Sequence, residues 1–280
     1  MPDKNTDFDP LLMPYIVVHN QRIHYSEHRA AVGPERMPLV LVHGAGGTLY
    51  HWPPGLRRLA QHDVFAIDLP GHGRSAGPGR EDIGDYADFL QDWAEALGLP
   101  PFVLAGHSMG GGIALTFALR YPQRLRGLAL VATGARLRVH PDILQGIRLD
   151  KEGVGEQLVD WVHGHRASPA QRRQYLRHFM ATDTDVMYGD WLACDRFDVM
   201  QQLADIHLPA LIIAGSQDRM TPVKYAAFMA DSLPDADLTV IEGAGHMIML
   251  EQPELVVGAI TGFLERLQRT GDERGAPDKR

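Results

Sequence analysis

The chain has 280 residues, and its 27 Lys and Arg against 35 Asp and Glu give a formal charge of −8. That balance argues against nonspecific nucleic-acid binding, which needs a basic surface. The lone cysteine, Cys194, excludes an internal disulfide, while the polar start and the lack of an 18-residue apolar run predict a cytoplasmic protein without a membrane span. The length predicts one domain, with or without an insertion.

The predicted elements begin with a hairpin, in which residues 15–18 and 23–25 flank the turn HNQR at 19–22. Continuous apolar runs, typical of strands buried on both faces of a parallel sheet, follow at 39–42, 64–67, 102–105, 128–131, 210–214 and 238–241. Helical periodicity is found at 86–97, 110–121 and 255–267. This alternation predicts an α/β fold with a mostly parallel central sheet and helices on both faces.

The alternation stops in residues 134–205, which contain no clear strand and are rich in Arg, His, Trp and Met. We expect a helical cap, or lid, inserted there after the sixth strand. The α/β core then comprises residues 15–133 and 206–269. Residues 1–14 and 270–280 are polar and are expected to be disordered tails.

A serine lies between two glycines at the end of the predicted strand 102–105. The segment Gly106-His107-Ser108-Met109-Gly110 matches the pattern G-x-S-x-G between a strand and a helix. Because so sharp a turn strains the backbone of its central residue, small residues are needed two positions away on each side. No phosphate-loop pattern is present, so the remaining alternative for this motif alone is a structural turn.

A second glycine-rich loop, His43-Gly44-Ala45-Gly46, follows the strand at 39–42. Glycine-rich backbone can approach a ligand closely and present N–H donors to it. The Ala45 and Met109 N–H groups are therefore candidates for an oxyanion hole, with His43, Gly44 and Gly46 as its supporting loop. Without the serine motif, a flexible connection would explain this loop equally well.

Two further polar residues follow the last two predicted strands: Asp218 after 210–214 and His246 after 238–241. Taken singly, Asp218 could cap a helix and His246 could be structural. Ligands of open α/β sheets bind at the carboxyl ends of the strands, where Ser108, Asp218 and His246 would all lie. Their chain order is that of the α/β-hydrolase fold. From about 15 to 267 the sequence resembles that superfamily, with DLPGHGRS at 68–75 as a further match.

These residues predict nucleophilic catalysis with Ser108 as nucleophile, His246 as general base and Asp218 orienting the imidazole. The expected function is hydrolysis of a small-molecule carboxylic ester, small or medium and apolar, without a metal or organic cofactor. Alternatives within the superfamily are a lactonase, a cofactor-free perhydrolase and a C–C bond hydrolase of ring-cleavage products. The last is weakened by Met247, since those enzymes usually have Trp there. A ligand-binding protein on the same fold is the non-enzymatic alternative, and the oligomeric state stays open.

Methionine and aromatic side chains suit an apolar substrate, so Met247, Trp191 and Tyr188 are expected to line the pocket. The pair His163 and His165 lacks the further ligands of a zinc site and is expected on a solvated helix face. We expect structural roles for three other side chains. Cys194 should be buried as a small hydrophobic residue, His107 should pack behind the serine turn, and His43 should support the oxyanion loop.

Overall fold

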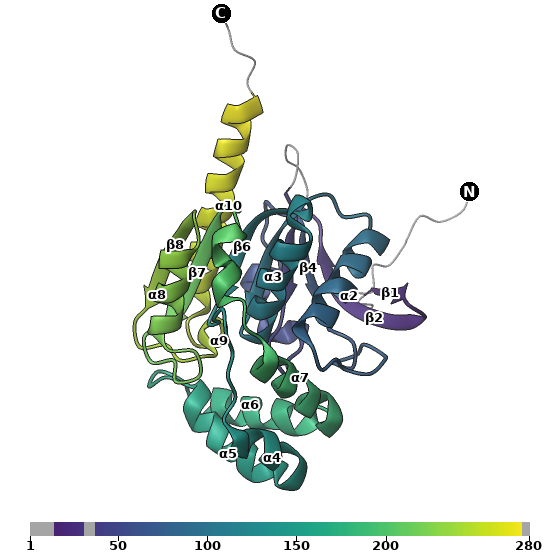
Figure 1. Ribbon diagram of the computed structural model, residues 1–280, viewed down its shortest axis with the longest axis vertical. Coiled ribbons are helices and arrows are strands. Elements are labelled where there is room, and N and C mark those ends of the chain that lie inside the picture. Colours follow the sequence, from purple (N-terminus) through teal and green to yellow (C-terminus); the bar gives the residue numbers. More distant parts are fainter. Residues whose placement is uncertain (1–13, 31–36, 276–280) are drawn as a thin grey trace, which may run out of the picture.

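The computed structural model describes residues 14–30 and 37–275, with side chains up to residue 270. This part of the chain contains one eight-stranded sheet of order β1-β2-β4-β3-β5-β6-β7-β8 (Figure 1). Strand β2 pairs antiparallel with both β1 and β4, and every other pairing is parallel. The strands are β1 (Tyr15–Val18), β2 (Gln21–His28), β3 (Leu39–Val42), β4 (Val64–Ile67), β5 (Phe102–His107), β6 (Leu125–Val131), β7 (Ala210–Gly215) and β8 (Ala236–Ile241). The predicted fold class is confirmed.

The hairpin at the edge of the sheet has a shorter turn than its sequence predicts. Only His19 and Asn20 lie between β1 and β2, and both have positive φ angles of 49° and 60°. Two central residues with positive φ form the turn type that matches the twist of the flanking strands. Residues Gln21 and Arg22, predicted to be in the turn, therefore pair in the sheet.

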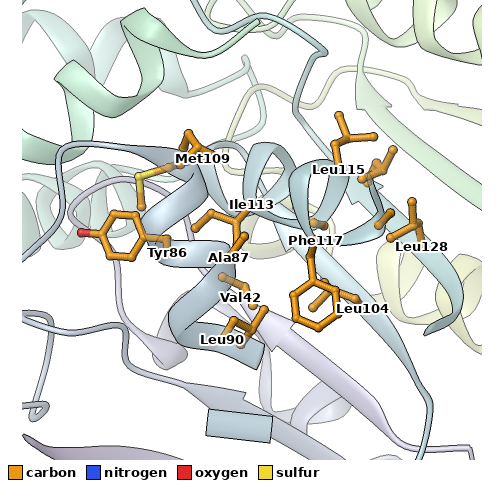
Figure 2. Packing of buried hydrophobic residues seen from close by; sticks show 14 of the residues in the cluster. Val42, Tyr86, Ala87, Leu90, Leu104, Met109, Ile113, Leu115, Phe117 and Leu128 are labelled. Atoms are coloured by element: carbon orange, nitrogen blue, oxygen red, sulfur yellow. The ribbon is translucent and has the colours of Figure 1, made fainter. Parts of the chain in front are cut away.

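Helices cover both faces of the sheet. On one face lie α2 (Ile83–Ala96), α3 (Met109–Arg120) and α8 (Val223–Ser232), and on the other α1 (Pro54–Arg57), α9 (Ile248–Glu251) and α10 (Pro253–Gly275). Figure 2 shows the first layer, where Ile113 and Phe117 of α3 pack with Val42 and Leu104 of the sheet. These residues are fully buried and fix the position at which α3 begins, directly after β5.

Four helices are inserted between β6 and β7: α4 (Pro141–Leu149), α5 (Lys151–Val162), α6 (Pro169–Ala181) and α7 (Thr184–Arg196). They lie together at one end of the sheet (Figure 1) and share a small hydrophobic cluster of their own. Each begins at a residue whose side chain accepts a hydrogen bond from its first turn: His140, Asp150, Ser168 and Asp183. These caps explain how short helices form in a segment with little apolar periodicity.

The C-terminal helix is longer than predicted. Helix α10 continues to Gly275, so residues 270–275 are helical where a disordered tail was expected; residues 276–280 lie outside the described part. At the other end, residues 1–13 of the expected N-terminal tail also lie outside it. Within the described ranges, no helix is long and apolar enough to cross a membrane.

Candidate active site

Ser108 occupies the turn between β5 and α3 with a strained backbone. Its φ is 52° and its ψ is −117°, a backbone conformation that residues other than glycine rarely adopt. A Cβ on Gly106 would lie 2.0 Å from the carbonyl oxygen of Gly110, and one on Gly110 would lie 2.4 Å from that of Val42. Both glycines are therefore required for the turn that projects the Ser108 hydroxyl from the end of the strand.

Three residues that are far apart in the sequence form one hydrogen-bonded chain at this end of the sheet. Ser108 Oγ lies 2.9 Å from His246 Nε2, and His246 Nδ1 lies 2.8 Å from Asp218 Oδ2. Because an ionised carboxylate only accepts, Nδ1 carries the imidazole proton, and Nε2 is free to accept from the serine hydroxyl. His246 and Asp218 are almost fully buried, which protects this chain of bonds from competing water.

The carboxylate of Asp218 is held by its own turn. Oδ1 accepts hydrogen bonds from the N–H groups of Met220 (2.8 Å) and Thr221 (2.9 Å), and Oδ2 accepts from the Thr221 hydroxyl at 2.7 Å. The alternative of a helix cap does not apply, because α8 begins after Pro222 without a side-chain cap. The turn thus aims the second oxygen of Asp218 at His246.

The two candidate oxyanion donors lie on either side of the serine. Ala45 lines the same cavity as Ser108, and Met109 is the first residue of α3, where backbone N–H groups have no intrahelical acceptor. Among the loop and cap hydrogen bonds between described residues, none has the Ala45 or Met109 N–H as donor. The following N–H, of Gly46, is engaged by Asp190 Oδ2 at 2.7 Å, so the loop is fixed while Ala45 stays available.

Buried histidines surround the serine turn. His43 donates from Nδ1 to the Gly44 carbonyl (2.8 Å) and accepts the Leu69 N–H at Nε2 (3.1 Å), so it connects the glycine-rich loop to the segment after β4. His107 donates from Nε2 to the His246 carbonyl at 3.0 Å behind the turn. Burial lowers the pKa of His43 to about 4 and that of His51, which lines the cavity at Ser108, to about 3. Both rings are neutral at physiological pH.

These depressed pKa values predict a loss of stability in mild acid. Between the native pKa values and the unfolded value of 6.5, the unfolded chain binds more protons, so the free energy of unfolding falls as the pH drops from 6.5 towards 4. At pH 5 His43 and His51 should each contribute a loss of about 2 kcal/mol. Urea unfolding at pH 7.5 and pH 5 measures this loss; His51→Gln should reduce it and the exposed His165→Gln should not. An equal loss in both variants would contradict the assignment.

A buried aspartate on α7, which the sequence did not single out, connects the inserted helices to the core. Besides Gly46 N–H, Asp190 accepts from His72 Nε2 (2.7 Å) and from the Tyr86 hydroxyl (2.6 Å). Burial alone would lower the pKa of His72, but the adjacent Asp190 carboxylate outweighs it, and the pKa is raised. These partners lie 104 to 144 positions away in the chain, so no local pattern marks Asp190.

Removing this carboxylate should be strongly destabilising. In Asp190→Ala three buried donors lose their acceptor, and breaking a buried pair in this way costs about 3–5 kcal/mol. Asp185→Ala, on the same helix but exposed, should change stability by only about 0.5 kcal/mol. Urea unfolding of both variants measures the difference, and equal stability of the two would refute the role given to Asp190.

The loop that carries His246 is also tied to the inserted helices. The carbonyl of Val162, the last residue of α5, accepts hydrogen bonds from the N–H groups of His246 (2.8 Å) and Met247 (3.1 Å). Glu251 Oε2 accepts from Gly164 (2.9 Å) and Gly245 (3.1 Å), joining the same two segments. The insertion therefore holds the loop that carries His246.

The prediction of a solvated helix face for His163 and His165 is wrong for the first of them. His163 is buried at the end of α5, where Nδ1 donates to the Val159 carbonyl at 2.8 Å and the ring contacts Tyr175. His165 is exposed. Within the described residues there is no group of three or more His, Cys, Asp or Glu side chains suited to a metal ion.

A narrow cavity of about 70 Å³ opens onto Ser108 and His246. Of the three side chains predicted to line the pocket, Met247 and Trp191 line this cavity. The buried Cys194 lines it too. Tyr188 does not, because the Arg148 guanidinium of α4 lies 3.6 Å from its ring centroid and holds the ring between α4 and α7. Other side chains line the cavity although no sequence motif predicts it: Leu137, Arg138, Val139, Tyr175 and Tyr225.

Comparison with known proteins adds family information to this geometry. A family model described as alpha/beta hydrolase fold matches residues 37–253. A dihydrolipoyllysine-residue acetyltransferase component of an acetoin cleaving system from Pseudomonas putida is 31% identical over 241 residues. The match covers 82% of this chain and 64% of that protein's length. Carboxylesterase YbfK of Bacillus subtilis is 28% identical over 85% of this chain and 83% of its own. A thermophilic esterase structure has a TM-score of 0.80 at 31% identity, covering 91% of this chain and 98% of that one.

Proposed function

The chain belongs to the α/β-hydrolase fold family, and from that premise we propose that it is a serine hydrolase that cleaves carboxylic esters of small or medium apolar substrates. The observation that carries the proposal is the continuous hydrogen-bonded chain from Ser108 through His246 to Asp218. The similarity to a carboxylesterase and to a thermophilic esterase supports an ester as the substrate.

In the acylation step, Ser108 Oγ attacks the ester carbonyl carbon while its proton passes to His246 Nε2. The carbonyl oxygen becomes an oxyanion that the N–H groups of Ala45 and Met109 stabilise, each contributing roughly 3–4 kcal/mol to lowering the barrier. Asp218 stabilises the imidazolium that forms. When the tetrahedral intermediate collapses, the C–O bond breaks and the alcohol leaves with the proton from His246 Nε2.

Deacylation repeats these roles with water as the nucleophile. His246 Nε2 takes a proton from the water as it attacks the acyl-serine carbonyl, and it returns that proton to Ser108 Oγ when the carboxylic acid departs. The same two backbone donors stabilise the second oxyanion. We assign residues 134–205 the role of a lid. Hydrogen bonds connect Val162 of this segment to the loop that carries His246, and Asp190 to the glycine-rich loop at Gly46.

A burst assay tests the proposal. With p-nitrophenyl acetate and butyrate, acyl-serine formation should release about one equivalent of nitrophenol per active site before a slower steady state. The burst is visible when deacylation is slower than acylation, and catalysis without a covalent intermediate would give none. A C–C bond hydrolase would instead consume a vinylogous diketone in its dienol form, which is followed by loss of its visible absorbance, and would leave the aryl esters nearly untouched.

A further inference from the structure

A second cavity adjoins the active site. It has about 390 Å³ of space, against about 70 Å³ for the cavity at Ser108, and Arg138 and Tyr225 line both. The cavity at Ser108 is therefore the smaller of these two spaces. Because Arg138 and Tyr225 line both cavities, the part of the substrate beyond the reacting group has a route along these two side chains towards the larger space.

The charge of this second cavity is opposite to that of the whole chain. Among the described residues, its lining includes Arg136, Arg138 and Lys224 and no carboxylate, although the chain as a whole carries a formal charge of −8. In the active-site cavity itself, Arg138 is the one lining side chain among the described residues with a permanent charge. A concave surface lined by one sign of charge raises the local concentration of ligands of the other sign.

The two arginines of this cavity form long ion pairs with nearby carboxylates. Arg138 lies 3.8 Å from Asp195 Oδ1, and Arg136 lies 3.5 Å from Asp198 Oδ2, both longer than the 2.7–2.9 Å of a charge-assisted hydrogen bond. Asp195 Oδ1 also accepts the Val139 N–H at 3.1 Å. The two guanidinium groups therefore retain N–H donors for a ligand, and Arg138 lines both cavities.

We propose that this basic cavity, defined by Arg136, Arg138 and Lys224, binds a carboxylate at the far end of the substrate's acyl chain. The inference rests on the proposed ester hydrolysis and specifies its substrate class: monoesters of dicarboxylic acids, with an apolar spacer between the two ends. Tyr225, Met200 and Phe228 supply the apolar surface for that spacer. Bidentate pairing with Arg138 then sets the register of the ester at Ser108.

The test compares p-nitrophenyl monoesters of adipate and suberate, which have a free carboxylate, with the same esters capped as neutral primary amides. The ratio of kcat/KM for the anionic over the neutral ester should be about tenfold in the wild type and should fall as NaCl is raised. Arg138→Gln should lower that ratio about tenfold, and Lys224→Gln should lower it less. Arg148→Gln, on α4 and outside both cavities, should leave it unchanged.

A ratio of one or less in the wild type, or one that is the same in Arg138→Gln, Lys224→Gln and Arg148→Gln, would overturn the proposal. Calorimetry with ethyl hydrogen adipate and its amide-capped analogue on Ser108→Ala separates binding from turnover. Turnover of neutral esters without tighter binding of the anion would refute the carboxylate site alone. Tighter binding of the anion by an enzyme that turns over no ester would refute the proposed hydrolysis alone.

Discussion

Replacing Ser108 by alanine is expected to lower kcat for p-nitrophenyl esters by a factor of about 10⁴ or more. The variant lacks the oxygen that lies 2.9 Å from His246 Nε2, so no acyl-enzyme can form, and only the oxyanion donors remain to accelerate attack by water. Folding should not change measurably, because alanine experiences the same backbone strain at φ 52° as serine does. Steady-state kinetics and thermal unfolding of the same preparation measure both quantities.

The matched control is Ser232→Ala at the end of α8, a half-buried serine outside both cavities. Its kinetics should equal those of the wild type. Residual activity of Ser108→Ala within a factor of ten of that control would mean that another nucleophile, or direct attack by water, performs the reaction.

The second large effect concerns Asp218→Asn, for which kcat should fall by about 10⁴, the size of loss found when the triad carboxylate becomes an amide in another serine hydrolase. The amide can direct its NH₂ group at His246 Nδ1, which then becomes an acceptor and moves the imidazole proton to Nε2. In that tautomer Nε2 cannot accept the proton of Ser108. The hydrogen bonds from Met220 and Thr221 to Oδ1 fix the side chain, so the error is one of tautomer rather than of position.

Asp237→Asn on β8 is the control, since Asp237 is exposed and pairs with Arg266 at the surface. It should retain full activity. A loss of less than tenfold in Asp218→Asn would show that the carboxylate does not select the tautomer, and a different acceptor for His246 Nδ1 would then have to be sought.

The sequence predicted the elements whose signal is local. The runs at 39–42 and 64–67 coincide with β3 and β4, because buried parallel strands are continuously apolar and end at His43 or Asp68. The turn at Ser108 was equally readable, since both of its glycines are required by contacts close to it in the chain or sheet. The polar segment 270–275 gave no such signal, yet it continues α10.

Features that depend on distant contacts could not be predicted. Asp and Glu side chains usually lie at the surface. Asp190 and Glu251 are buried because hydrogen-bond donors from other loops and helices surround their carboxylates. The His163 ring is buried against Tyr175 while His165 is exposed, and the Tyr188 ring packs against Arg148 outside the pocket. Such positions become visible only when the inserted helices are placed over the sheet.

The central claim is that Ser108 is the nucleophile, and peptide mass spectrometry after incubation with a fluorophosphonate tests it most directly. The reagent should add one phosphonyl group per chain, on the peptide that contains Ser108, with loss of esterase activity in proportion to labelling. Asp218→Asn should be labelled far more slowly than the wild type. Full inhibition with the adduct on another residue, or ester hydrolysis that continues while Ser108 is fully modified, would contradict the account.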